Sequence, residues 1–438
     1  MGNKMKKERS TPKGGMGLKD VFRSLRHRNY RLWFVGQGIS LIGTWMQQIA
    51  MMWLVYTLTN SVFLLGVVGF AGQIPFFIFA PIAGALVDRW NRHRTVIATQ
   101  TLSMIQAFVL AFLVFTGIIE VWHILLLSLA LGFITAVDMT VRQAFIVDMV
   151  DDRRDLGNAI ALNSSLINGG RLIGPSIAGI LIATVGEGMC FFINGLSFLA
   201  VIIALLAMKI SPREMDKKKT PAMTALKEGF SHVSRFLPIR YIILLIGLVS
   251  LMGMPYQLLM PVFAKDILHG DPNTLGYLMA ASGVGALIGA FYLASRKTFM
   301  KLGRIVPTAA SVFGIGLIAF SLSRSLPFSL IFMVITGLGM MIQLTSSNTT
   351  LQNIVDDNRR GRVMAFWGMA SFGAAPFGNL LMGSLADAIG APNTLIIGGA
   401  CCVAGSLLFF RKLPTLKKMV APMYKRKDSV SKAGSSSF

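Results

Sequence analysis

The chain has 438 residues, of which 54% are hydrophobic and only 14% are charged, and its formal net charge at pH 7 is +23. Soluble domains average about 25% charged residues, so this composition excludes an ordinary soluble protein. The positive charge could indicate a nucleic-acid-binding protein, but the sequence has no separate basic domain, and we expect no nucleic-acid partner.

Twelve apolar stretches follow one another along the chain, each near or above the roughly 20 residues that a helix needs to cross a bilayer. Lipid offers no water to backbone polar groups, so helices are the expected form. The sequence therefore predicts an all-α integral membrane protein with twelve transmembrane helices. The predicted spans are residues 32–57, 62–87, 95–117, 122–147, 159–184, 188–208, 240–263, 273–295, 305–323, 326–350, 363–388 and 393–411.

The distribution of lysine and arginine along the chain predicts how these helices are oriented in the membrane. If the N-terminus lies inside, all but four of the 42 lysines and arginines fall in segments on the inner side. Lys265 and Arg324 lie in outer links, and Arg142 and Arg171 lie within spans. This bias predicts that both termini are cytoplasmic, and it makes anionic lipid an expected partner of the basic segments.

Residues 1–31 form the predicted cytoplasmic N-terminal segment. Residues 1–16 are polar and basic, and we expect them to be disordered. Leu18, Val21, Phe22 and Leu25 then recur at helical spacing among basic residues. This pattern predicts a short amphipathic helix that lies on the inner leaflet.

Thr44, Gln47 and Gln48 place polar side chains inside the first span. Polar side chains at this depth are costly against lipid, so they face protein or a water-filled cavity. Hydrogen bonds between helices and the lining of a cavity account for them equally well.

The link between the second and third spans reads GALVDRWNRHR, from Gly84 to Arg94, and carries Asp88, Arg89 and Arg92. It resembles the signature loop of the major facilitator superfamily of transporters. The resemblance implies a cytoplasmic gate made of Gly84, Asp88, Arg89, Arg92 and Arg94. Gly84 would allow a neighbouring helix to approach closely, and Asp88 would cap a helix N-terminus of the other half of the protein. The alternative is that Asp88 and Arg89 only set the topology.

Three charged residues lie well inside the predicted helices: Asp138 and Arg142 in the fourth span and Arg171 in the fifth. Each would cost roughly 2.5–3.5 kcal/mol at mid-bilayer, so each should be paired or face water. Asp138 and Arg142 are four residues apart, which suits an ion pair on one helix face. Asp138 is therefore a candidate proton-coupling acid, with Arg142 and Arg171 as switching partners. A fixed structural ion pair is the alternative.

The fifth span also contains Gly170, Gly174, Pro175 and Gly179. Small residues on one helix face let two helices approach closely. The series resembles the antiporter motif of drug exporters, which implies that this packing seals one face of the transport cavity. Generic helix packing explains the same residues.

Similar short sequence motifs in the two halves of the chain indicate an internal duplication. Val150–Arg154 reads VDDRR, and Val355–Arg360 reads VDDNRR, with Val150 and Val355 205 positions apart. Two six-helix halves are a common plan of transporters. The predicted units are a bundle at 32–208, a cytoplasmic linker at 209–239, a second bundle at 240–411 and a disordered basic tail at 412–438.

Residues 20–411 as a whole resemble the major facilitator superfamily, and smaller features resemble its bacterial exporter branch, which includes the enterobactin exporter and macrolide-efflux relatives. Two prolines that this branch often has in the fourth span are replaced here by Thr140 and Val147. The resemblance implies two pseudo-symmetric six-helix bundles, with Gln47, Gln257 and Gln343 among the residues that line the central cavity. The features that carry it are Arg28–Leu32, Trp45–Gln47, Asp138 with Arg142–Ala144, and Asn158–Ala159.

The predicted function is secondary active export of small lipophilic molecules, of the drug or siderophore type, driven by protons. An importer of a small polar solute and a membrane scaffold or sensor are the alternatives. The sequence shows no ATP-binding loop and no nucleophile–base arrangement, so we expect no enzyme and no cofactor. Cys190, Cys401 and Cys402 have no metal-ligand spacing, so we expect no metal. The resemblance implies a monomer in the bacterial inner membrane.

Overall fold

The structure is a computed structural model that describes residues 22–86, 90–210, 233–295, 302–355 and 357–435. Every regular element in these ranges is a helix, which confirms the all-α prediction. Most of the predicted linker at 209–239 lies outside the described residues, as do residues 1–21.

Six helices form the first half of the chain, and each begins and ends within a few residues of a predicted span. Asn60 and Gly186 end two of them with positive φ values of 47° and 86°, which let the chain reverse after a short link. The helices are α2 (Arg28–Thr59), α3 (Val62–Leu86), α4 (Arg92–Phe115), α5 (Val121–Phe145), α6 (Leu156–Val185) and α7 (Glu187–Leu206).

Two passes of the second half are interrupted. The seventh pass consists of α9 (Leu237–Met252), α10 (Tyr256–Val262) and a π-helical turn, η4 (Phe263–Ile267). The eleventh consists of α14 (Asp357–Gly368), a π-helical turn, η6 (Met369–Gly373), and α15 (Ala375–Ile389). Pro255 and Pro376 stand at the breaks, where a proline ring cannot donate a backbone hydrogen bond.

The remaining helices are α11 (Pro272–Ala294), α12 (Leu302–Leu322), α13 (Leu326–Ile354) and α16 (Ala391–Ser435). Among the described residues, 11 helices are long and apolar enough to cross a membrane. The interrupted eleventh pass supplies the twelfth crossing. The twelve predicted spans are therefore present as twelve passes.

The structure describes part of both ends of the chain. Arg23–Arg26 is a single 3-10 turn, η1, that pairs with Asp155, and Leu18 and Val21 of the predicted amphipathic helix lie outside the described residues. The last helix, α16, continues to Ser435, past residue 412 where the predicted tail begins. Leu413 and Leu416 are buried against the bundle, so the last helix extends beyond its apolar span.

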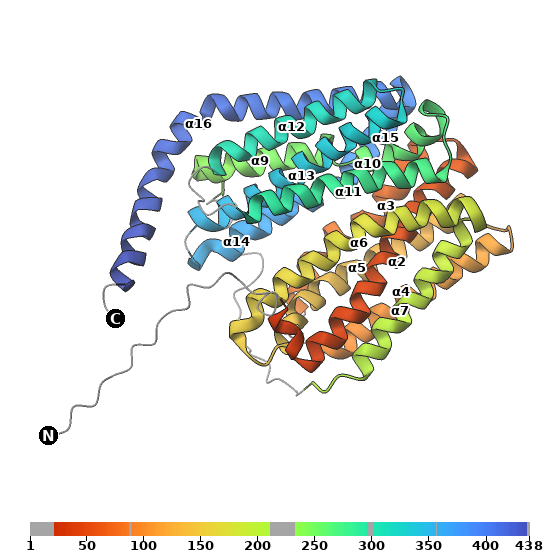
Figure 1. Ribbon diagram of the computed structural model, residues 1–438, viewed down its shortest axis with the longest axis horizontal. Helices are drawn as coiled ribbons and strands as arrows, with labels where there is room; N and C mark the ends of the chain where they lie inside the picture. Colours follow the sequence, from red (N-terminus) through yellow and green to blue (C-terminus); the bar gives the residue numbers. More distant parts are fainter. Residues whose placement is uncertain (1–21, 87–89, 211–232, 296–301, 356, 436–438) are drawn as a thin grey trace.

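Helices α2–α7 pack into one bundle and α9–α16 into a second (Figure 1). The main contacts between the bundles are those of α6 with α11 and of α3 with α15, and α10 also packs against α2 and α3. Figure 1 shows the bundles close together at the end that holds the α2–α3 and α10–α11 links, and further apart at the end that holds both termini.

Glycines allow the two joining contacts. A Cβ atom on Gly179 of α6 would lie 2.9 Å from the Pro272 carbonyl oxygen and 3.2 Å from Gly276 Cα of α11. A Cβ on Gly66 of α3 would lie 2.8 Å from the Asn379 carbonyl oxygen of α15. Backbone atoms cannot move aside as flexible side chains do, so these positions have no room for a larger residue.

Gly179→Ala should therefore separate α6 from α11 and lower the thermal unfolding midpoint of the purified protein. Overpacking typically costs about 1–3 kcal/mol. Gly169→Ala is the matched control on the same helix, because a Cβ there meets nothing within 4 Å. Equal midpoints for the two variants would show that the glycine contact does not hold the bundles together.

Candidate functional site

Asp138 forms the buried polar centre of the first bundle. Its carboxylate accepts hydrogen bonds from Thr99 Oγ1 at 2.7 Å and Gln100 Nε2 at 3.0 Å, both on α4. Arg142 Nε lies 3.5 Å from the other carboxylate oxygen, so the predicted ion pair forms. Asp138 is only 7% exposed, and these contacts supply the partners that a buried carboxylate requires. Thr99 and Gln100 were not predicted from the sequence, although two adjacent polar residues in an apolar span are a usable signal.

Arg171, predicted as a second switching partner of Asp138, has other neighbours in this conformation. Its guanidinium carbon lies 5.7 Å from the centre of the Trp45 ring, and Nη2 lies 3.5 Å from Met340 Sδ on α13. Gly170 and Gly174, the first glycines of the packing motif, bring α6 against α2 at Trp45. Arg171 therefore lies between the two bundles.

The glutamines predicted to line the cavity have different surroundings. Gln47 is 4% exposed and joins three helices, because it donates to Gln106 on α4 at 3.0 Å and accepts from Asn194 on α7 at 2.7 Å. This geometry supports helix–helix hydrogen bonding and not cavity lining. Gln343 is fully buried on α13, so it does not line an open cavity in this conformation either. Gln257 is half-buried, and its amide is 3.4 Å from the Tyr256 hydroxyl.

The residues predicted for the gate are only partly described. Gly84 lies in the last turns of α3, and Asp88 and Arg89 lie outside the described residues. Arg92 opens α4 and pairs with Asp148 after α5 at 3.1 Å, a partner that the sequence analysis missed. Arg94 donates its backbone N–H to the Asn91 side chain, which caps the helix, and its own side chain is exposed.

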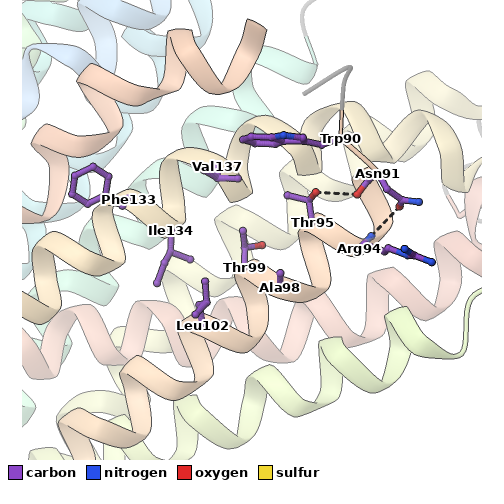
Figure 2. A pocket seen from close by; sticks show the side chains of 10 residues that line it. All are labelled: Trp90, Asn91, Arg94, Thr95, Ala98, Thr99, Leu102, Phe133, Ile134 and Val137. Carbon is purple, nitrogen blue, oxygen red and sulfur yellow. Dashed lines mark hydrogen bonds between the residues drawn. The ribbon is translucent and has the colours of Figure 1, made fainter. Parts of the chain in front are cut away.

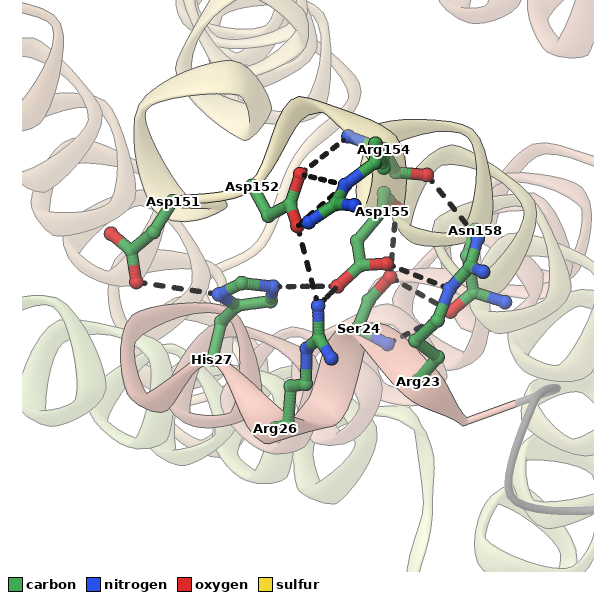
Figure 3. Close-up of polar contacts among 9 residues, drawn as sticks. All are labelled: Arg23, Ser24, Arg26, His27, Asp151, Asp152, Arg154, Asp155 and Asn158. Carbon is green, nitrogen blue, oxygen red and sulfur yellow. Dashed lines mark hydrogen bonds and ion pairs between the residues drawn. The ribbon is translucent and has the colours of Figure 1, made fainter. Parts of the chain in front are cut away.

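A cluster of charged groups ties the start of the chain to the link between α5 and α6 (Figure 3). We call it the N-terminal clasp, and it comprises Arg23, Ser24, Arg26 and His27 with Asp151, Asp152, Asp155 and Asn158. It contains Asp151 and Asp152, the two aspartates of the first copy of the repeated VDD motif, so this motif has a structural role in this half.

Asp155 is the centre of the clasp. Its carboxylate, 2% exposed, pairs with Arg23 Nε at 2.7 Å and Arg26 Nη2 at 2.6 Å. His27 Nε2 lies 2.9 Å from the same group. The hydrogen bond to His27, with the charges of Arg26 and Arg23, holds the pKa of Asp155 below its ordinary value.

Further contacts lie within the clasp and beside it. The Ser24 backbone N–H and hydroxyl lie 2.9 Å and 2.7 Å from Asn158 Oδ1. Arg154 donates to the Asp152 carboxylate and lowers the pKa of that group to about 2. The clasp thus holds the first residues of α2 against the start of α6.

A second polar cluster connects the two bundles at the opposite end of the molecule. We call it the outer latch, and it comprises Tyr56, Asn60, Lys265 and Asp266. The Tyr56 hydroxyl donates to Asp266, and Lys265 Nζ donates to Asn60 Oδ1 at 2.9 Å. Lys265 Nζ also lies 5.4 Å from the centre of the Tyr56 ring. The latch was not predicted from the sequence, in which Lys265 indicated only an outer link.

The chain matches a family model described as transmembrane secretion effector over residues 20–431. It is 26% identical to the staphyloferrin A transporter of Staphylococcus aureus over 386 residues, which covers 87% of this chain and 95% of that protein. It is 25% identical to the multidrug efflux pump Tap of Mycolicibacterium fortuitum, covering 82% and 88% of the two chains. Macrolide efflux protein A of Streptococcus pyogenes is also 25% identical, with coverages of 86% and 94%.

Among solved structures, a bacterial homologue of the human lysosomal transporter Spinster, in an inward-facing and unoccupied conformation, has a similar fold. The TM-score is 0.68 at 16% identity, and the match covers 94% of this chain and 99% of that chain. This similarity shows that the two chains share a fold.

The N-terminal clasp should open in acid. An aspartate whose pKa is lowered by folding stabilises the folded contact above its ordinary pKa, about 3.9, and this stabilisation is lost as the pH falls through the lowered value. A fluorophore on Phe22→Cys, in a protein without its native cysteines, should therefore lose anisotropy below about pH 4.

Asp155→Asn should give the low anisotropy already at pH 7. Asp151→Asn is the control, because Asp151 is 87% exposed and contacts only His27 among the clasp residues. A pH-independent anisotropy, or the same loss in both variants, would contradict the central role of Asp155.

Proposed function

The chain belongs to the transmembrane secretion effector family of the major facilitator superfamily, and we propose that it is a proton-coupled exporter of small lipophilic molecules. Secondary transport and export follow from the family and from relatives that are efflux pumps and a staphyloferrin A transporter. The finer proposal is that the cargo is of the drug or siderophore type and that protons drive its export.

One observation supports alternating access in this chain. The two bundles are held together by glycine contacts and by the outer latch, and they separate toward the end that holds the termini. When two bundles are in contact at one end and separated at the other, the space between them opens to the side of the membrane where they are separated. Arg171, Trp45 and Met340 lie at this centre and combine a cation with apolar surface, which suits lipophilic molecules that carry polar groups.

The protein is a multi-pass membrane protein of a bacterial transporter family. We place it in the plasma membrane as a monomer with both termini in the cytoplasm, as the lysine and arginine bias favours. In this orientation the loop with Gly84, Asp88, Arg89, Arg92 and Arg94 is the cytoplasmic gate, and the outer latch closes the extracellular side.

Asp138 is our candidate for the proton-coupling residue. It is a carboxylate buried inside the first bundle, held by an arginine and two neutral donors. Movement of α5 relative to α4 would alter these contacts during the transport cycle. Arg142 is its switching partner, and Arg171 acts separately, at the centre between the bundles.

Asp138→Asn should abolish gradient-driven export and retain exchange, because the amide keeps hydrogen bonds but cannot carry a proton. The assay is uptake of a radiolabelled macrolide and of a labelled siderophore into inside-out vesicles with an imposed proton gradient. Exchange of the labelled compound for the unlabelled one is measured without the gradient. Asp387→Asn is the matched control, since Asp387 is an exposed carboxylate at the end of α15.

Normal gradient-driven uptake by a well-expressed Asp138→Asn variant would assign Asp138 a structural role only. Uptake by the unaltered protein that persists after an ionophore collapses the gradient would contradict proton coupling.

A further inference from the structure

A groove of about 660 Å³ runs between α4 and α5 in the first bundle, and its lining does not include Arg171, Trp45 or Met340 (Figure 2). One wall is a stripe on α4 that includes Thr95, Thr99 and Leu102, and Phe133 and Ile134 of α5 form the other wall. Residues that recur at this spacing share one helix face.

The groove opens to the lipid side of the bundle. Leu102 is 50% exposed, and an exposed apolar stripe continues from it along α4 through Ile105, Val109 and Phe112. α4 packs on α5 and α7 of its own bundle, so this stripe faces outward. In a bilayer these side chains contact acyl chains.

The two ends of the groove differ in chemistry. Trp90, Asn91 and Arg94 form its mouth, and Figure 2 shows them at one end, beside the α3–α4 link. The Arg94 side chain is exposed and has no ion pair or hydrogen bond with any residue that the structure describes. Tryptophan and arginine are the residues that favour the headgroup level of a membrane.

The length of the groove matches one leaflet. From Arg94 to Leu102 is eight residues of helix, roughly 12 Å at 1.5 Å per residue. One leaflet contributes about 15 Å of hydrocarbon. A phosphate at Arg94 therefore places the attached acyl chain along Leu102, Phe133 and Ile134.

We propose that this groove binds one anionic phospholipid, with its phosphate at Arg94 and Trp90 and one acyl chain between α4 and α5. The charge at the mouth selects the headgroup, and the apolar walls select an amphiphile over a free anion. The bound lipid would contact Thr99, whose hydroxyl donates to Asp138. The inference is independent of the transported cargo.

The internal repeat provides a matched control. Arg304 follows Arg94 by 210 positions, is also exposed, and lies in the first turn of α12, the counterpart of α4. Ala309 stands where the first half has Thr99. Arg304→Glu changes the charge of the protein by the same amount as Arg94→Glu without touching the groove.

The test is native mass spectrometry of the delipidated full-length protein, titrated with phosphatidylglycerol or with phosphatidylcholine of the same acyl chains. We expect one phosphatidylglycerol to bind at least five-fold more tightly than phosphatidylcholine. Arg94→Glu should weaken phosphatidylglycerol binding roughly five- to thirty-fold, since each basic residue near an anionic lipid contributes about a factor of five. Arg94→Gln should weaken it about five-fold, and Arg304→Glu should leave it unchanged.

Ala98→Trp tests the apolar part, because Ala98 lies in the wall and a large side chain there fills the groove. It should weaken binding of both lipids. Equal affinity for the two lipids, equal losses in Arg94→Glu and Arg304→Glu, or unchanged binding in Ala98→Trp would each overturn the proposal. Displacement of phosphatidylglycerol by millimolar glycerol 3-phosphate would also overturn it, because a free phosphate would then suffice.

Discussion

The packing of the two bundles depends on close contact between helix backbones at glycine residues. In a membrane no hydrophobic effect drives helices together, so close approach and well-placed polar contacts must hold the bundles. Gly179 and Gly66 provide the close approach, from α6 to α11 and from α3 to α15. The outer latch adds hydrogen bonds at the same end. Among the described residues the bundles are thus joined most strongly toward one end, which is the geometry that rocking of one bundle against the other requires.

The two bundles differ in the side chains that are buried at equivalent positions of their helices. Asp138 and Gln343 stand 205 positions apart, the offset of the repeated VDD motif, and both are buried. Asp138 has an arginine and two neutral donors around it, whereas Ala309 and Ala310 occupy the places of Thr99 and Gln100 in the second half. The second half keeps a polar side chain at this position but not the charge. The fold is duplicated, and the chemistry is concentrated in the first copy.

The sequence was sufficient for the twelve passes, because the length of an apolar span is set by the thickness of the bilayer. It was also sufficient for the ion pair between Asp138 and Arg142, because a spacing of four residues defines one helix face. It did not reveal contacts between distant helices, such as Arg171 with Trp45 and Met340, because these depend on how α6 is rotated. The docking of Arg23 and Arg26 on Asp155 could not be predicted for the same reason: a basic amphipathic stretch suits a lipid surface as well as an acidic protein surface.

The central claim is that the two bundles move as units about the end that the outer latch closes. Pulsed electron paramagnetic resonance distances between spin labels test it most directly, with one pair at Ser164 on α6 and Gln352 on α13, and a second pair at Thr184 on α6 and Ile389 on α15. All four residues are exposed, and each pair spans the two bundles. When Tyr56→Phe and Asp266→Asn remove the Tyr56–Asp266 hydrogen bond of the latch, the account predicts that the Thr184–Ile389 distance lengthens while the Ser164–Gln352 distance shortens. Distances that stay unchanged, or that lengthen together, would contradict it.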